Sequence, residues 1–114
     1  MGMVKIYIPE RGDIVWTDFI PAAGHEQMGK RPALVLSPAL FNKKIGLALV
    51  APVTSRVRGH GFEVLLEGKK IKGAVLCHQI KMIDYNKRGL QFAEKSSSFV
   101  TSDVLAKVKA LVSE

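Results

Sequence analysis

Short apolar runs recur along the chain, separated by glycine, proline, asparagine and lysine. Runs of this length and spacing are typical of the strands of a small β-barrel. The predicted strands are 13–19 (DIVWTDF), 33–37 (ALVLS), 46–53 (GLALVAPV), 61–67 (GFEVLLE), 74–84 (AVLCHQIKMID) and 90–92 (LQF). We expect 74–84 to be either one longer strand or a bulged pair. Pro52 cannot donate to a ladder, so we expect it at a strand end, an edge or a bulge.

Polar segments between these runs predict turns, and only the C-terminal segment changes to a helical period. The predicted turns are FNKKIG (41–46), GKKIKG (68–73) and NKRG (86–89). In 101–114 the apolar residues fall on one helical face, comprising Val104, Leu105, Val108, Leu111 and Val112. Thr101 or Ser102 can cap this helix, and Asp103 adds a favourable charge in its first turn. We therefore expect a terminal helix that packs on the barrel.

The length and composition of the chain predict one globular domain over residues 1–114. A chain of 114 residues, 47% of them hydrophobic, can bury one core but not two. Cys77 is the one cysteine, so no internal disulfide can form and a reducing compartment is indicated. The longest apolar segment, 45–53, is about half the length that a membrane helix requires. We expect a cytoplasmic protein with no membrane-spanning segment.

The charge balance is strongly basic. Lysine and arginine number 17 against 10 acidic residues, which gives a net charge of +7 and a pI near 9.8. Such a surface predicts an anionic partner, which at this point can be nucleic acid, an acidic protein segment or a membrane surface. The basic residues are scattered over turns rather than gathered in a tail. Each small cluster can therefore also be solubilising charge.

The segment GHEQMGKRPALVL (24–36) places proton-transfer and anion-binding groups directly before a predicted strand. It belongs to a long connection, residues 20–32, and connections of this length in small domains often carry function. Arg31 offers a planar set of donors that matches phosphate oxygens, and a carboxylate such as Glu26 can remove a proton from an attacking hydroxyl. RNA brings that hydroxyl with it as its 2′-OH. An exposed ion pair between Glu26 and Arg31 is the alternative.

A second polar set follows the third predicted strand, and it comprises Thr54, Ser55, Arg56, Arg58 and His60. Hydroxyl and guanidinium groups beside glycines can line a groove for phosphates and bases. The same residues can equally form a solvated hairpin tip. The residues alone leave these two alternatives open.

The sequence predicts neither a metal site nor a bound cofactor. Its histidines are widely separated, and it contains no CxxC motif, HxxxH motif or glycine-rich phosphate cradle. Cys77 and His78 are neighbours, but adjacent strand residues point to opposite faces. They therefore form no thiol–imidazole pair unless a bulge intervenes.

Taken together, RGDIVWTDFIPAAGHEQMGKRPALVLSPALFN, APVTS, GF, HQIKMID and the closing helical segment resemble the MazF/PemK family of toxin endoribonucleases. The resemblance runs from about Arg11 to the C-terminus, with the motifs in order. It implies a mainly β fold, a small SH3-like antiparallel β-barrel of the CcdB/PemK type with a C-terminal α-helix, assembled as a homodimer.

The same resemblance implies the activity and the partners. Family members cleave single-stranded RNA, chiefly messenger RNA, at short sequences and without a metal, and they inhibit translation and growth. Their products carry a 2′,3′-cyclic phosphate and a 5′-hydroxyl. A cognate acidic antitoxin, similar to MazE or PemI, neutralises them by laying a disordered segment along the RNA groove. A protein with a charge of +7 suits such a partner.

The resemblance also implies roles for particular residues. Glu26 and Arg31 fall on the family's loop carboxylate and loop arginine, and Thr54 falls on a hydroxyl residue that some members use for catalysis. Because arginine keeps its proton at neutral pH, we expect Arg31 to stabilise the phosphate, and His25 or water to protonate the leaving oxygen. We expect contacts to RNA from Phe19, His25, Gln27, Lys30, Asn42, Ser55, Arg56, Arg58, His60, His78 and Gln79.

The segment LCHQ departs from the family pattern. Leu76 and His78 stand where other members have an arginine and an aspartate, so a mechanism that uses those two groups does not transfer. His78 is then a candidate for base contact or acid catalysis, and a buried structural histidine is the alternative.

Two rival functions remain for this sequence. A gyrase poison of the CcdB type shares the fold, but such poisons end in a tail that contains tryptophan, whereas this chain ends in LVSE and has its only tryptophan at position 16. The other rival is a non-catalytic RNA-binding barrel, which Glu26, Arg31 and Thr54 argue against without excluding it.

Overall fold

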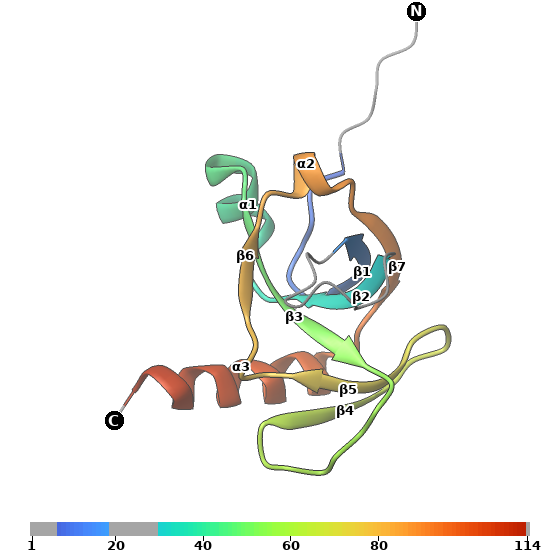
Figure 1. Cartoon of the computed structure of the whole chain (residues 1–114). Coiled ribbons are helices and arrows are strands. Elements are labelled where there is room, and N and C mark those ends of the chain that lie inside the picture. The colour runs from blue at the N-terminus through green and yellow to red at the C-terminus, as the bar shows by residue number, and fades with distance from the viewer. Residues whose placement is uncertain (1–6, 19–29, 114) are drawn as a thin grey trace, which may run out of the picture.

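The computed structural model describes residues 7–18 and 30–113, and it shows a curled antiparallel sheet with a long C-terminal helix (Figure 1). The strands are β1 (Asp13–Asp18), β2 (Lys30–Val35), β3 (Ala48–Thr54), β4 (Glu63–Glu67), β5 (Lys72–Leu76), β6 (Lys81–Ile83) and β7 (Gln91–Lys95). The helices are α1 (Ala39–Ile45), α2 (Tyr85–Arg88) and α3 (Ser98–Val112). The expected mainly β barrel with a C-terminal helix is confirmed.

Strand β3 is the centre of the sheet. The strand order is β4-β5-β3-β2-β1-β7, and β6 also pairs with β3. On one edge, β3 pairs first with β6 at Ala48–Val50 and then with β5 at Val53 and Thr54. Pro52 lies inside this strand, at the point where the partner changes from β6 to β5. Neither partner pairs with β3 at this residue, so the missing N–H of proline does not interrupt the ladder on this side. The predicted segment 74–84 accordingly splits into β5 and β6.

Both faces of the sheet are buried. Successive residues of a strand belong to different core clusters because their side chains point to opposite faces. Ile14 and Leu34 belong to a core cluster that also contains Val104 of α3. Their neighbours Val15 and Ala33 belong to a second cluster, which Tyr85 of α2 completes. In Figure 1, α3 runs along one end of the curled sheet, and α1 and α2 lie at the opposite end.

The C-terminal helix begins earlier than its sequence pattern suggested. Ser97 caps it by accepting a hydrogen bond from the Val100 backbone N–H, so the predicted caps Thr101 and Ser102 are wrong. The helix packs on the sheet through Val104, Leu105 and Val108. Leu111 and Val112, which were expected on the same buried face, are 42% and 80% exposed, because the last turn extends beyond the core.

Two of the predicted turns are short helices. Residues 39–45 form α1, which ends at Gly46 with φ of 83°, and residues 85–88 form α2, which Asp84 caps through its side chain. Helix α1 leaves Leu40 and Ile45 exposed. Its apolar residues therefore do not form the buried stripe from which a helix can be predicted in a sequence. Within residues 7–18 and 30–113, none of the helices has the length and apolar character needed to cross a membrane.

Candidate functional site

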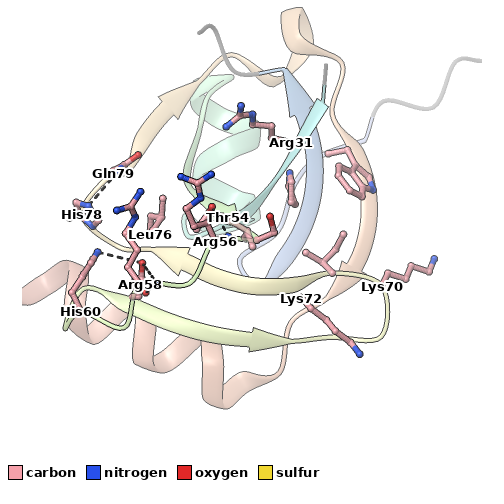
Figure 2. A pocket seen from close by; sticks show the side chains of 16 residues that line it. Arg31, Thr54, Arg56, Arg58, His60, Lys70, Lys72, Leu76, His78 and Gln79 are labelled. Atoms are coloured by element: carbon pink, nitrogen blue, oxygen red, sulfur yellow. Dashed lines mark hydrogen bonds and ion pairs between the residues drawn. The ribbon is translucent and has the colours of Figure 1, made fainter. Parts of the chain in front are cut away.

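A large groove opens where the strand ends of β2, β3 and β5 meet the connection between β3 and β4 (Figure 2). Its volume of about 1270 Å³ exceeds the roughly 300–1,000 Å³ typical of sites for small molecules. The predicted site residues that line it are Arg31, Thr54, Ser55, Arg56, Arg58, His60, His78 and Gln79. The fold therefore gathers residues from three separate parts of the sequence around one space large enough for an extended ligand.

Arg31 and Thr54 come to the groove from neighbouring strands. Strands β2 and β3 are antiparallel, and Ala33 pairs with Pro52. Two residues further in this register lead to Arg31 on β2 and to Thr54 on β3. Arg31 is exposed, and both residues line the groove; in Figure 2, Thr54 lies near its middle and Arg31 at its upper side. The two neighbouring strands therefore bring a guanidinium and a hydroxyl to the same groove.

The Thr54 hydroxyl is oriented by the backbone that follows it. The N–H of Arg56 donates a hydrogen bond of 3.1 Å to Thr54 Oγ1. An oxygen that already accepts this bond keeps its own proton for donation to another acceptor. The hydroxyl is thereby prepared to donate to a phosphate oxygen.

Gly73 allows β5 to lie close to the end of β3. Its φ is +149°, and a Cβ at this position would collide with the carbonyl group of Thr54. The next residue, Ala74, pairs with Thr54 in the sheet. Only glycine combines this backbone conformation with so close an approach, so Gly73 supports the geometry around Thr54.

The groove is strongly cationic. Its described lining includes the side chains of Arg31, Arg56, Arg58, Lys70 and Lys72. The sequence identified Lys70 and Lys72 only as part of a charged turn. The pairing of β4 with β5, and of β5 with β3, brings that turn to the same groove as Thr54. Trp16, which the sequence analysis did not assign to the site, also lines the groove.

Glu63 is the one carboxylate among the described residues that line the groove. It accepts backbone N–H bonds from Gly59 at 2.7 Å and from Arg58 at 3.0 Å, and His60 Nε2 lies 3.5 Å from it. The bond from Gly59 is the main cause that lowers the pKa of Glu63, with the Arg58 bond and the nearby cationic groups adding to it against desolvation. The carboxylate therefore holds the loop through these bonds, and the cationic side chains of the described lining outnumber its single negative charge.

Two further predicted residues lie away from this groove. Lys30 is exposed at the start of β2, and its Nζ is 3.5 Å from the carbonyl oxygen of Gly89. Asn42 was expected to contact RNA, but its side chain is fully buried and donates to the carbonyl oxygens of Pro9 and Ser37. The prediction for Asn42 is therefore wrong, since its amide anchors α1 to the N-terminal segment. Phe19, His25, Glu26 and Gln27 lie outside the described residues.

Cys77 and His78 do not act as a pair. Cys77 is fully buried in the core, and burial raises the pKa of its thiol to about 11. His78 is exposed and lines the groove, so the alternative of a buried structural histidine is wrong. Among the residues that the structure describes, no three histidine, cysteine, aspartate or glutamate side chains are grouped so that they could hold a metal ion.

Comparison with known proteins gives a consistent picture for nearly the whole chain. Residues 10–113 match a family model described as "PemK-like, MazF-like toxin of type II toxin-antitoxin system". The endoribonuclease toxin MazF of Escherichia coli K12 is 46% identical over 87 residues, which are 76% of this chain and 78% of that protein. The endoribonuclease toxin ChpB of the same organism is 42% identical over 116 residues, covering 96% of this chain and 99% of ChpB.

Solved structures are similar over the same extent. The crystal structure of a MazE–MazF complex from Deinococcus radiodurans contains a chain with a TM-score of 0.85 and 41% identity, and the match covers 94% of this chain and 97% of that one. The structure of MazF alone from the same organism gives a TM-score of 0.84 at 41% identity, covering 94% of this chain and 98% of that one.

Proposed function

This chain belongs to the PemK-like, MazF-like family of type II toxins and is an endoribonuclease, and we propose that it cleaves single-stranded RNA, chiefly messenger RNA, at short sequences and without a metal ion. The observation that carries the proposal is that Arg31 and Thr54, from neighbouring strands, line the same cationic groove. The size of the groove favours an oligonucleotide over a single nucleotide. Cleavage of messenger RNA in the cytoplasm would inhibit translation and growth.

The reaction we propose is an internal transfer of the phosphodiester. The 2′-oxygen attacks the adjacent phosphorus, the bond from phosphorus to the 5′-oxygen breaks, and the products carry a 2′,3′-cyclic phosphate and a 5′-hydroxyl. The 2′-hydroxyl loses a proton to a general base, and the leaving 5′-oxygen gains one. Because the nucleophile belongs to the substrate, the protein has to supply proton transfer and charge stabilisation only.

The described residues supply the charge stabilisation. The Arg31 guanidinium can contact two phosphate oxygens at once, and it stabilises the extra negative charge that develops at phosphorus. Thr54 donates its hydroxyl proton to the same group. We assign the general base to Glu26 on the basis of the sequence, and the proton on the leaving oxygen to His25 or water. A substrate-contacting role for Ser55, Arg56, Arg58, Gln79 and the predicted loop residues belongs to the same proposal.

A cognate antitoxin is the second partner of this function. The similar solved structures include MazF bound to MazE, which supports an antitoxin partner for this chain. We assign the groove cations as the contact for an acidic antitoxin segment, which would compete with RNA for Arg31, Arg56 and Arg58. Such a complex should weaken as salt is added, and a complex insensitive to salt would point to an apolar interface instead.

A homodimer is the assembly we expect. Strand β4 lies at one end of the described sheet, and Leu65 on it is 58% exposed. An edge strand that exposes a large apolar side chain is a surface that a second chain can cover. Light scattering should give twice the 12.5 kDa mass of the chain for wild type, and Leu65→Glu should shift the protein towards the monomer. A monomeric wild type would contradict the assembly but not the cleavage.

The decisive experiment is the digestion of a long defined RNA in the presence of EDTA, with both new ends mapped at every cut. We expect cutting at a short recurring sequence, with cyclic phosphate and 5′-hydroxyl ends. Loss of activity in EDTA, or 5′-phosphate ends, would contradict the proposed reaction. Binding of RNA without any cutting would favour a non-catalytic barrel, and inhibition of gyrase without cutting would favour a poison of the CcdB type.

A further inference from the structure

His60 and His78 line one end of the groove, and the ring of Phe62 lies next to both of them. The ring centroids of His60 and His78 are 5.0 Å apart in an edge-to-face arrangement, and Phe62 lies 6.0 Å from His78 and 6.4 Å from His60. His60 and Phe62 come from the connection before β4, and His78 comes from the turn after β5. Figure 2 shows His60, His78 and Gln79 on one side of Thr54, with Lys70 and Lys72 on the other.

These rings are exposed although they are large and partly apolar. Phe62 is 43% exposed, the His60 side chain is 41% exposed, and His78 is exposed as well. Elsewhere the same chain buries Tyr85 in its core. A cluster of rings that remains open to solvent beside a cationic groove offers flat surfaces to a ligand that contains flat rings of its own.

Hydrogen bonds hold the rings in position. His60 Nδ1 accepts a bond of 3.2 Å from the Phe62 backbone N–H, and Glu63 lies 3.5 Å from Nε2 of the same ring. Both nitrogens of His60 are therefore engaged within the loop, and the ring offers mainly its face. The Gln79 amide nitrogen lies 3.4 Å from His78 Nε2. This contact with the neighbouring side chain helps to orient the second ring.

We propose that His78, flanked by His60 and Phe62, is the stacking subsite for one unpaired base of the RNA, and that it contributes to the choice of the sequence that is cut. The inference rests on the proposed function, and it assigns one position of the cleavage motif to this ring cluster. Proteins that bind single strands combine a cationic groove along the backbone with aromatic rings on which bases stack. Here the groove supplies Arg56 and Arg58 beside the rings.

The sharpest test uses an RNA of the cleaved sequence that carries 2′-O-methyl groups, since these remove the attacking hydroxyl and leave binding measurable. Single abasic positions are introduced one at a time, and affinity is measured by fluorescence anisotropy. For wild type, one abasic position should weaken binding about tenfold through the loss of one stacked base. In His78→Ala the intact RNA should bind about tenfold more weakly, and the same abasic position should cost little more.

The matched variants separate stacking from other roles. His78→Phe keeps a ring face without ring nitrogens, so it should retain most of the affinity and most of the kcat. A collapse of kcat in His78→Phe would overturn the proposal in favour of acid catalysis. Phe99→Ala is the control, because Phe99 is a ring that is 79% exposed and does not line the groove. It should bind the whole abasic series as wild type does.

The cleavage motif gives the second measurement. Mapped cuts in a long RNA should show His78→Ala relaxed at one motif position, with KM raised more than kcat is lowered. If wild type cuts and His78→Ala keeps the same motif, KM and abasic profile, the subsite is wrong and the proposed function stands. If wild type cuts no RNA, the proposed function fails, and the same abasic series on a defined single-stranded RNA that wild type binds still decides on the subsite. If His78→Ala weakens the binding of an acidic peptide but leaves RNA binding unchanged, the stacking subsite is wrong as well.

Discussion

The backbone N–H of Arg56 donates a hydrogen bond to the side-chain oxygen of Thr54, and this bond leaves the hydroxyl proton directed to another acceptor. If that acceptor is the phosphate in the transition state, Thr54→Val should lower kcat by roughly a hundredfold, as the loss of one preorganised donor does elsewhere. Thr54→Ser keeps the hydroxyl and should stay within about tenfold of wild type. Single-turnover cleavage of a short RNA measures both, and equal rates for Val and wild type would remove Thr54 from the mechanism.

Arg31 should matter through the shape of its side chain as well as its charge. Arg31→Ala should reduce cleavage by on the order of a hundredfold or more if, as we propose, the guanidinium of this groove residue stabilises the phosphate in the transition state. Arg31→Lys keeps the charge but loses the two parallel donors, so it should recover only part of the rate. Arg31 is exposed, so neither variant should change the thermal midpoint appreciably. An Arg31→Ala protein that cleaves like wild type would contradict the proposed reaction.

Gly73 should prove necessary for both stability and activity. Alanine at this position would place its Cβ against the Thr54 carbonyl group and would strain a backbone with φ of +149°. We expect Gly73→Ala to lower the free energy of unfolding by roughly 1–3 kcal/mol and to reduce kcat by displacing Thr54. Gly61→Ala is the control, since a Cβ there meets nothing within 4 Å. A denaturation midpoint for Gly73→Ala equal to that of Gly61→Ala would show that β5 can move away without cost.

The comparison of sequence and structure separates local signals from long-range ones. The strands were predictable because their apolar runs are local, and so was the residue set around Thr54, because it is contiguous. The place of Lys70 beside that set depends on how β5 pairs with β3, which no local pattern encodes. Asn42 shows the opposite error, since a polar residue in a polar segment gives no sign that its amide will be fully buried. Glu26 is supported by the family resemblance and lies outside the described residues.

The turn that carries Lys70 should depend on Glu94 and therefore on pH. Glu94 on β7 accepts backbone N–H bonds from Ile71 at 2.7 Å, from Lys70 at 2.9 Å and from Lys69 at 3.0 Å. Desolvation on its own would raise the pKa of Glu94, but these bonds outweigh it and lower the pKa below its usual 4.5. The stabilisation is therefore present above about pH 4.5 and is lost as the pH falls through the lower value of the folded state.

Glu94→Gln removes this titration. At pH 7 the variant should be less stable than wild type by roughly 1 kcal/mol, a small effect because the carboxylate is partly exposed. The difference should shrink at pH 3, where the wild-type carboxyl also begins to be protonated. Urea denaturation at the two pH values measures it, with Glu67→Gln at the end of β4 as the control. A stability difference that stays constant from pH 7 to pH 3 would show that the charge of Glu94 does not hold the turn.

Lys70 and Lys72 should add affinity for RNA without adding sequence preference. Both line the groove on the side away from His78, where ammonium groups can pair with successive phosphates (Figure 2). Neutralising a phosphate of a single strand contributes about −0.7 to the slope of log K against log salt, so Lys70→Ala with Lys72→Ala should reduce that slope by roughly 1.4. Lys43→Ala with Lys44→Ala is the control, because these lysines end α1 and do not line the groove. Titrations of a 2′-O-methyl RNA at several salt concentrations measure the slope, and an unchanged slope in the first pair would mean that the phosphates follow a different path.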